Sequence, residues 1–167
     1  MRTSLRRVVV HSAGILLYRP GREGPEVLLG HMGGPFWARK QEHAWSIPKG
    51  ELDADEEPRA AAMREFSEEL GLPAPDVEYA DLGTVRYGSG KLLHVFAGEA
   101  PDFGLDGFAP GTFALEWPPR SGRTAEFPEV DEVRWADVAD ARVLLVKGQL
   151  GVLDALERHL AARPEEG

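Results

Sequence analysis

Three glutamates, Glu65, Glu68 and Glu69, lie in a segment of strong helix formers that runs from residue 57 to residue 70. At the helical rotation of ~100° per residue, their side chains share one ~100° arc beside an apolar arc. Like charges at these spacings repel one another, and a divalent cation would remove that repulsion. Carboxylates without sulfur or clustered imidazole favour a hard ion such as Mg²⁺ or Mn²⁺ over zinc. Taken alone, the three glutamates also fit the solvated face of a surface helix.

The residues around these glutamates follow a longer pattern. Gly50 is followed after five residues by Glu56, and seven more residues lead to Arg64-Glu-Phe-Ser-Glu-Glu-Leu-Gly-Leu72. This G-x5-E-x7-R-E-U-x-E-E-x-G-U spacing, in which U is a bulky apolar residue, resembles the Nudix box of the Nudix hydrolase superfamily at every defined position. The resemblance places the box at residues 50–72.

The resemblance implies an α/β fold, namely an α/β/α sandwich on a mixed sheet, with the box forming a loop, a helix and a second loop. It also implies that water attacks phosphorus in a nucleoside diphosphate derivative, with the help of two or more Mg²⁺ or Mn²⁺ ions. In the family, the positions of Glu56 and Arg64 form a salt bridge that orients the helix. The metal-binding positions correspond to Gly50, through its carbonyl, and to Glu65, Glu68 and Glu69. The residues expected to carry catalysis are therefore Glu65, Glu69, Arg64 and Glu56.

The attacking water must give a proton to a carboxylate. Within the box, Glu65 is the first candidate for this base. Some family members use a glutamate from a later loop, and Glu126 and Glu129, which precede a strand expected at 130–135, are the candidates in this chain. An ordinary solvated loop carboxylate is the alternative for each of these two residues.

The segment before the box, Trp45-Ser-Ile-Pro-Lys-Gly50, resembles that of diadenosine polyphosphate hydrolases and inositol pyrophosphate phosphohydrolases of the superfamily. Tyr87 lies 16 residues past Gly71, near the position of a tyrosine that marks the diadenosine polyphosphate hydrolases. The runs 30–50 and 116–131 resemble a bacterial group of Nudix NTP pyrophosphohydrolases, and Phe36 or Trp37 in the first run could stack on a base. The candidate substrate-binding residues are Lys49, Trp45, Arg39, Tyr87, Glu126 and Glu129.

The composition restricts the partners. The 167 residues include 28 acidic and 19 basic side chains, for a net charge of −9, which disfavours binding to long nucleic acids. The absence of cysteine excludes disulfides and thiolate catalysis. No apolar run approaches the ~18 residues of a membrane span. We therefore expect a cytoplasmic protein without a membrane partner, and the resemblance also allows a homodimer, because family members are often dimers.

Hydrophobic patterning predicts a single domain over residues 1–167, with a frayed tail at 163–167. Two hairpins are expected, from strands at 7–19 and 26–30 and from strands at 77–87 and 91–97. Shorter strands are expected at 45–47, 113–117 and 130–135, and helices at 57–70 and within 136–162. The remaining segments, including 100–112 and 120–128, are expected to be loops.

Two other classes of function compete with a hydrolase of NTPs or dinucleoside polyphosphates. One is a nucleotide-binding sensor that uses the same fold without significant turnover, although a pure binder has no need for the full set of carboxylates. The other is an acidic scaffold protein, which would leave the spacing of residues 50–72 as a coincidence. Hydrolysis of a phosphoanhydride would distinguish the hydrolase from the sensor and from the scaffold protein.

Overall fold

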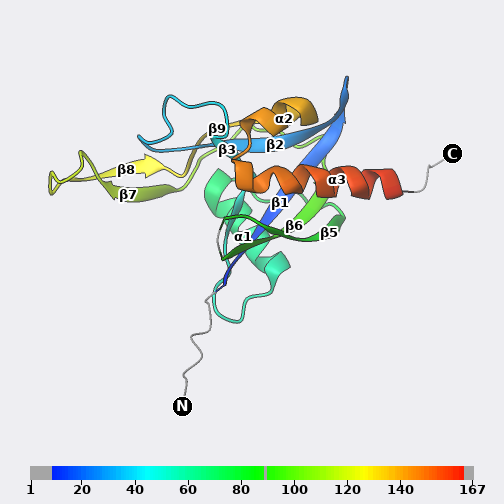
Figure 1. Cartoon of the computed structure of the whole chain (residues 1–167), viewed down its shortest axis with the longest axis horizontal. Helices are drawn as coiled ribbons and strands as arrows, with labels where there is room; N and C mark the ends of the chain where they lie inside the picture. Colours follow the sequence, from blue (N-terminus) through cyan, green and yellow to red (C-terminus); the bar gives the residue numbers. More distant parts are fainter. Residues whose placement is uncertain (1–8, 89, 164–167) are drawn as a thin grey trace, which may run out of the picture.

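The structure is a computed structural model that describes residues 9–88 and 90–163. The start of the strand expected from residue 7, and residues 164–167 of the expected tail, lie outside this range. Seven strands form a mixed sheet, two more form a separate hairpin, and the helices cover both faces of the sheet (Figure 1). The strands of the main sheet are β1 (Val10–Gly21), β2 (Gly24–Met32), β3 (Trp45–Ser46), β4 (Lys49–Glu51), β5 (Tyr79–Arg86), β6 (Lys91–Glu99) and β9 (Val130–Asp137). The helices are α1 (Pro58–Leu70), α2 (Val138–Leu144), the 3-10 turn η1 (Lys147–Gln149) and α3 (Leu150–Ala162).

The strands of the main sheet follow the order β3-β2-β1-β6-β5, with β4 paired to β1 and β9 paired to β2. The β1–β2 and β5–β6 pairs are antiparallel, as the two expected hairpins require. β1 and β6 run parallel, and they are joined through α1 and β5 rather than by a tight turn. The sheet is therefore mixed.

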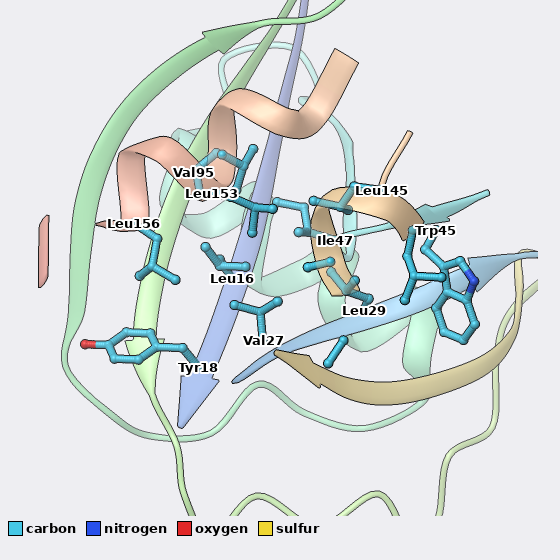
Figure 2. Packing of buried hydrophobic residues seen from close by; sticks show 14 of the residues in the cluster. Leu16, Tyr18, Val27, Leu29, Trp45, Ile47, Val95, Leu145, Leu153 and Leu156 are labelled. Carbon is cyan, nitrogen blue, oxygen red and sulfur yellow. The ribbon is translucent and has the colours of Figure 1, made fainter. Parts of the chain in front are cut away.

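The alternation of side chains along β1 divides the core into two layers. Ile15 and Leu17 point toward Phe66 and Leu70 of α1. Leu16, one residue out of phase, points to the opposite face and packs in the cluster formed with α2 and α3 (Figure 2). The expected α/β/α sandwich is thus confirmed, with α1 on one face of the sheet and α2 and α3 on the other.

β1 and β2 pair only near their shared turn, at Tyr18–Gly21 with Gly24–Val27. Further along, β1 pairs with β4 and β2 pairs with β3. The segment from Trp45 to Glu51 therefore lies between two diverging strands and changes partner at Ile47 and Pro48. β4 is the strand on which the box begins.

Helix α1 starts with Pro58 in its first turn and ends at Gly71, within one residue of the expected bounds. Gly71 has a φ of 66°, and its N–H donates to the Ser67 carbonyl. A Cβ at this position would collide with the Ala109 carbonyl, so both the conformation and the close approach require glycine. Gly71 therefore ends the helix and lets the later loop pack against it.

The segment 120–128, expected to be a loop, contains strand β8 (Thr124–Pro128), and that expectation is wrong. β8 pairs antiparallel with β7 (Thr112–Glu116), and this two-stranded hairpin projects from the body of the protein (Figure 1). In β8, the half-buried residues Ala125 and Phe127 alternate with exposed polar residues. This alternation is too short to be recognised in a segment that is mostly polar. Phe113 faces Phe127 across the hairpin, and Phe36 of the β2–β3 loop contacts Trp117 edge to face at 5.6 Å.

The segment 136–162 is not one continuous helix. β9 extends to Asp137, whose side chain caps α2 by accepting a hydrogen bond from the Asp140 N–H. The chain is extended at Leu145 before η1 and α3 begin. The longest helices in the described ranges, α1 and α3, have 13 residues each and would be ~20 Å long, too short to cross a bilayer.

Candidate active site

Arg64 is the centre of the charged part of the box. Its Nε and Nη2 donate to the two carboxylate oxygens of Glu56 at 2.9 and 2.8 Å, which forms a bidentate ion pair. Its Nη1 donates to Glu65 Oε1 at 2.9 Å and to Glu68 Oε2 at 3.1 Å, and its Nη2 also donates to the Glu51 carbonyl at 3.1 Å. One guanidinium therefore links the loop before α1 to two glutamates on α1.

These contacts shift the protonation of the groups involved. The hydrogen bonds from Arg64, followed by that from the Asp53 N–H, lower the pKa of Glu56 to about 2. The hydrogen bonds to Glu56, followed by those to Glu68 and Glu65, raise the pKa of the Arg64 guanidinium. The pair is thus charged throughout the physiological pH range and fixes the orientation of α1.

Glu69 occupies the more enclosed side of the cluster. Its Oε2 accepts a hydrogen bond from the Lys49 N–H at 3.2 Å, which joins α1 directly to β4. Burial of the carboxyl raises its pKa to about 8, although the nearby Lys49 charge opposes this shift. The charges of Glu129 and Glu65 raise the pKa further. The ionised form of Glu69 is therefore disfavoured unless a cation approaches.

Glu65 lies against the backbone of Gly50. A Cβ at Gly50 would overlap the Glu65 carboxylate, so any other residue here would displace that carboxylate. Burial raises the pKa of Glu65, partly opposed by its hydrogen bond and charge interaction with Arg64. Glu65, Glu69 and Gly50 thus come together where β4 meets α1, whereas Glu68 lies on the more exposed side of the helix.

Glu129 joins this cluster from the β8–β9 connection. It is held there by the Glu129 N–H, which donates to the Gly111 carbonyl at 2.8 Å, and the Gly111 N–H donates to the Glu68 carbonyl at 3.2 Å. Burial of its carboxyl, followed by the charge of Glu68, raises the pKa of Glu129. Glu126 lies instead in the exposed β7–β8 hairpin, opposite Ala114. Of the two later glutamates, Glu129 is the one whose charge raises the pKa of Glu65 and Glu69.

Lys49 and Tyr87 form a basic and aromatic edge beside the carboxylates. The Lys49 Nζ lies 5.6 Å from the centre of the Tyr87 ring, and the Lys91 Nζ lies 5.8 Å from it. The Tyr87 hydroxyl also donates a hydrogen bond to the Ser12 Oγ at 3.4 Å. The sequence analysis did not predict a role for Lys91. The only signal for it was its position after the turn of the second hairpin, which brings it back to the Tyr87 ring that Lys49 also contacts.

Two of the candidate substrate-binding residues lie elsewhere. Trp45 is fully buried, with its indole N–H donating to Gln41 Oε1 at 3.3 Å and the Arg134 guanidinium over its ring. It packs with Leu145 in the core (Figure 2), so the expectation that it contacts substrate is wrong: β3 turns the ring inward. Arg39 is exposed in the β2–β3 loop, and its expected contact with substrate stays a prediction.

A sequence model of the NUDIX domain matches residues 10–156, which is most of the chain. The chain belongs to the Nudix family. This Nudix protein is 43% identical to the RNA pyrophosphohydrolase of Alkalilimnicola ehrlichii over 64 residues, which are 36% of this chain and 35% of that relative. It is also 43% identical to the RNA pyrophosphohydrolase of Cellvibrio japonicus over 65 residues, 36% of this chain and 38% of the relative. These matches span little more than a third of the relatives' length.

Solved structures share the fold of this Nudix protein over almost its whole length. A Caenorhabditis elegans Ap4A hydrolase in a binary complex has a TM-score of 0.62 and 22% identity, covering 93% of this chain and 100% of that one. The Mycobacterium smegmatis Nudix hydrolase RenU has a TM-score of 0.61 and 23% identity, covering 94% and 89%. At these identities, the likeness establishes the fold alone.

Nudix proteins generally use divalent metal ions, and the donor atoms of this site fit such ions. In the ranges that the structure describes, no three His, Asp or Glu side chains form a ready-made metal cluster. Arg64 instead draws Glu65 and Glu68 toward itself, and the Lys49 N–H holds Glu69. The donors are oxygen atoms only, and burial disfavours the charge on Glu69, so a hard cation would relieve both the repulsion and the burial cost.

Gln149 is a further residue that sequence reasoning missed. Its side chain is fully buried and reaches the backbone of Ile47, immediately before the box. The only available signal was a single amide side chain between the apolar residues Val143–Val146 and Leu150–Leu153. Such a polar residue in an apolar surrounding requires a buried partner.

Proposed function

We propose that this Nudix protein is a pyrophosphohydrolase that uses Mg²⁺ or Mn²⁺ to hydrolyse a phosphoanhydride bond in an NTP or a dinucleoside polyphosphate. The observation that carries the proposal is the meeting of Glu65 and Glu69 with Gly50 and Lys49 at the junction of β4 and α1. This arrangement brings two carboxylates against the backbone of β4, and the charge of Lys49 acts on Glu69. Family membership and the names of the relatives, RNA pyrophosphohydrolase and Ap4A hydrolase, support the same class of reaction.

The metal ions would be held by the Gly50 carbonyl and by the carboxylates of Glu65, Glu68 and Glu69. When bound, Mg²⁺ or Mn²⁺ neutralises phosphate charge and lowers the pKa of a coordinated water. Arg64 orients the carboxylates by holding Glu65 Oε1 and Glu68 Oε2. The Lys49 N–H fixes Glu69 in the same way from β4.

Glu65 is the proposed base. Arg64 holds its Oε1, so Oε2 is the atom that takes the proton from the attacking water. Burial raises the pKa of this carboxyl and makes it a stronger base than an exposed glutamate. Glu129 is the alternative, because its charge acts on both Glu65 and Glu69.

Lys49 and Lys91 support a polyphosphate substrate. Both ammonium groups lie over the Tyr87 ring, and the charge of Lys49 acts on Glu69, in a chain whose net charge is −9. Two lysines at this edge provide local positive charge for phosphates that extend beyond the metal ions. We therefore rank substrates with three or more phosphates above a diphosphate such as ADP-ribose.

The test is a substrate panel. Diadenosine polyphosphates, NTPs, ADP-ribose and a short 5′-triphosphorylated RNA are incubated with Mg²⁺ or Mn²⁺, and phosphate or nucleotide products are measured. We expect turnover with metal, little binding of substrate in EDTA, and faster turnover for the longer polyphosphates. Tight, metal-dependent nucleotide binding without product would instead identify a sensor. The RNA tests whether the expectation against nucleic acid, which stays a prediction, extends to a phosphorylated end.

A further inference from the structure

The backbone just before the box has one amide that neither neighbouring strand can satisfy. β3 pairs with β2 and β4 pairs with β1, so the chain changes partner at Ile47 and Pro48. Proline has no N–H, and Ile47 is fully buried. The Ile47 N–H therefore needs a partner from outside the sheet, since an unpaired buried amide is costly.

Gln149 supplies that partner from the far end of the chain. Its Oε1 accepts a hydrogen bond from the Ile47 N–H at 3.1 Å, and its Nε2 donates to the Ser46 Oγ at 2.9 Å. The Ser46 hydroxyl in turn donates to the Ile47 carbonyl at 2.7 Å. The side-chain amide of Gln149 thus takes the place of a neighbouring strand at the point where the sheet is interrupted.

The segment that leads to Gln149 lies beside the segment before the box and is hydrogen-bonded to it at two points. The Val146 N–H donates to the Trp45 carbonyl at 2.8 Å, and the His43 N–H donates to the Val143 carbonyl at 2.9 Å. The backbone of Gly148 packs directly against Tyr87. The extended break between α2 and α3 is therefore what brings Gln149 to Ile47.

The connection from Gln149 to the site is short. Ile47 is followed by Pro48, whose carbonyl accepts from the Ile15 N–H at 3.1 Å, and then by Lys49, whose N–H holds Glu69. Gly50, against which Glu65 lies, is the next residue. A shift of the backbone at Ile47 would be transmitted over two or three residues to the groups that hold both glutamates.

We propose that Gln149 is a positioning residue for the active site, acting through Ile47 on Lys49 and Gly50. The inference rests on the proposed function for its effect on turnover, but the geometry that it describes belongs to the metal-free protein as well. Gln149 touches neither substrate nor metal. Its role is to fix the backbone from which the Lys49 N–H and the Gly50 carbonyl project.

The first experiment compares Gln149→Met, which keeps the shape of the side chain but removes both hydrogen bonds, with two controls. Gln41→Met makes the same change at a glutamine whose side chain, within the described residues, accepts from the Trp45 indole and does not reach the Ile47 backbone. Leu156→Val weakens the same core on α3 beside Tyr18, on the side of the cluster away from Ile47 (Figure 2). Hydrogen exchange of the Lys49 amide is measured by NMR without metal, and kcat, KM and Mn²⁺ affinity are measured with a diadenosine polyphosphate.

We expect the Lys49 amide to exchange at least about tenfold faster in Gln149→Met, because its hydrogen bond to Glu69 becomes less well fixed. We expect kcat to fall ~10-fold and Mn²⁺ affinity to fall as well, with KM within about twofold, as for other residues that orient metal ligands. Both controls should keep wild-type exchange at Lys49 and wild-type kcat. Ser46→Ala, which removes the partner of Nε2 and the Ser46 bond to the Ile47 carbonyl but leaves the bond between Gln149 and the Ile47 N–H, should change both quantities in the same direction by less.

Wild-type exchange at Lys49 in folded Gln149→Met would overturn the inference, and so would equal acceleration in Leu156→Val. If Gln149→Met does not fold, Ser46→Ala and the Lys49 exchange decide the matter. A wild-type protein that hydrolyses none of the substrates would refute the proposed function, while the exchange measurement would still decide the positioning role.

Discussion

Two regions hold the candidate site, and they hold it with different interactions. On the α1 side, Arg64 uses charged hydrogen bonds to Glu56, Glu65 and Glu68, in a partly exposed position. On the β4 side, the fully buried Gln149 uses neutral hydrogen bonds to the Ile47 N–H and to the Ser46 hydroxyl. Charged bonds near solvent respond to pH and salt, whereas buried neutral bonds respond mainly to packing. The hydrogen bonds that hold the carboxylates on α1 should therefore depend on pH and salt. Those that hold the facing backbone of β4 should depend mainly on packing.

The largest effect is expected where the two sides meet, at Glu69. Glu69→Gln keeps an acceptor for the Lys49 N–H but loses the charge needed for metal, so activity should fall at least ~100-fold. Because burial already raises the pKa of Glu69 to about 8, the neutral side chain should not lower the Tm. Calorimetry with and without Mn²⁺ checks this, since the metal should raise the Tm of the wild type only. Unchanged activity would remove Glu69 from the metal site.

The second prediction tests the charged side alone. Arg64→Lys keeps the positive charge but cannot bond to Glu56 in a bidentate manner while also reaching Glu65 and Glu68. We expect kcat to fall ~10-fold, with the wild-type charge balance intact. Kinetics at 0.05 and 0.5 M NaCl should show a stronger salt dependence for Arg64→Lys than for Gln149→Met. Equal salt dependence would mean that the two sides do not differ as described.

The third prediction concerns acid. Arg64 lowers the pKa of Glu56 to about 2 in the folded protein, below its value of 4.5 in a free side chain. The ion pair therefore contributes stability above about pH 4.5, and this contribution is lost as the pH falls through about 2. The Tm difference between wild type and Glu56→Gln should be largest near pH 6 and should narrow toward pH 2. A difference independent of pH would show that Glu56 acts through packing instead.

The smallest effect is expected outside both regions, where the β2–β3 loop contacts the β7–β8 hairpin. The Phe36 side chain contacts Trp117 but is 60% exposed, so Phe36→Ala should change the free energy of unfolding by less than ~0.5 kcal/mol. Its kcat should equal that of the wild type, and denaturant unfolding and steady-state kinetics measure both quantities. A large loss of stability would show that the hairpin belongs to the main core.

The sequence alone was sufficient for the parts of the site that lie close together in the chain. The spacing from Gly50 to Leu72 placed Glu65, Glu68 and Glu69 on one helix, and Pro58 and Gly71 marked its ends. Glu129 was a candidate from its position before a strand, but its choice over Glu126 required the register of the hairpin. Local patterns therefore predicted which residues of the box lie together, and the three-dimensional pairing decided between similar residues.

The misplaced and missed residues depend on contacts between distant segments. Trp45 stands four residues before Lys49, yet β3 turns its ring into the core, and nothing in the local sequence indicates which face is buried. Gln149 lies 102 residues from its backbone partner, with no repeated pattern that links the two. Strand β8 needed β7 for its hydrogen bonds, so its own polar sequence favoured a loop.

The separation of Ile47 from Gln149 also has a consequence for the making of the protein. At a synthesis rate of ~5–20 residues per second, the 102 residues between them take roughly 5–20 seconds to be added. During that time the whole box has been translated, but Gln149, which binds the Ile47 N–H just before it, has not. On the growing chain, the backbone that carries Lys49 and Gly50 is therefore one of the last parts of the candidate site to reach its final geometry.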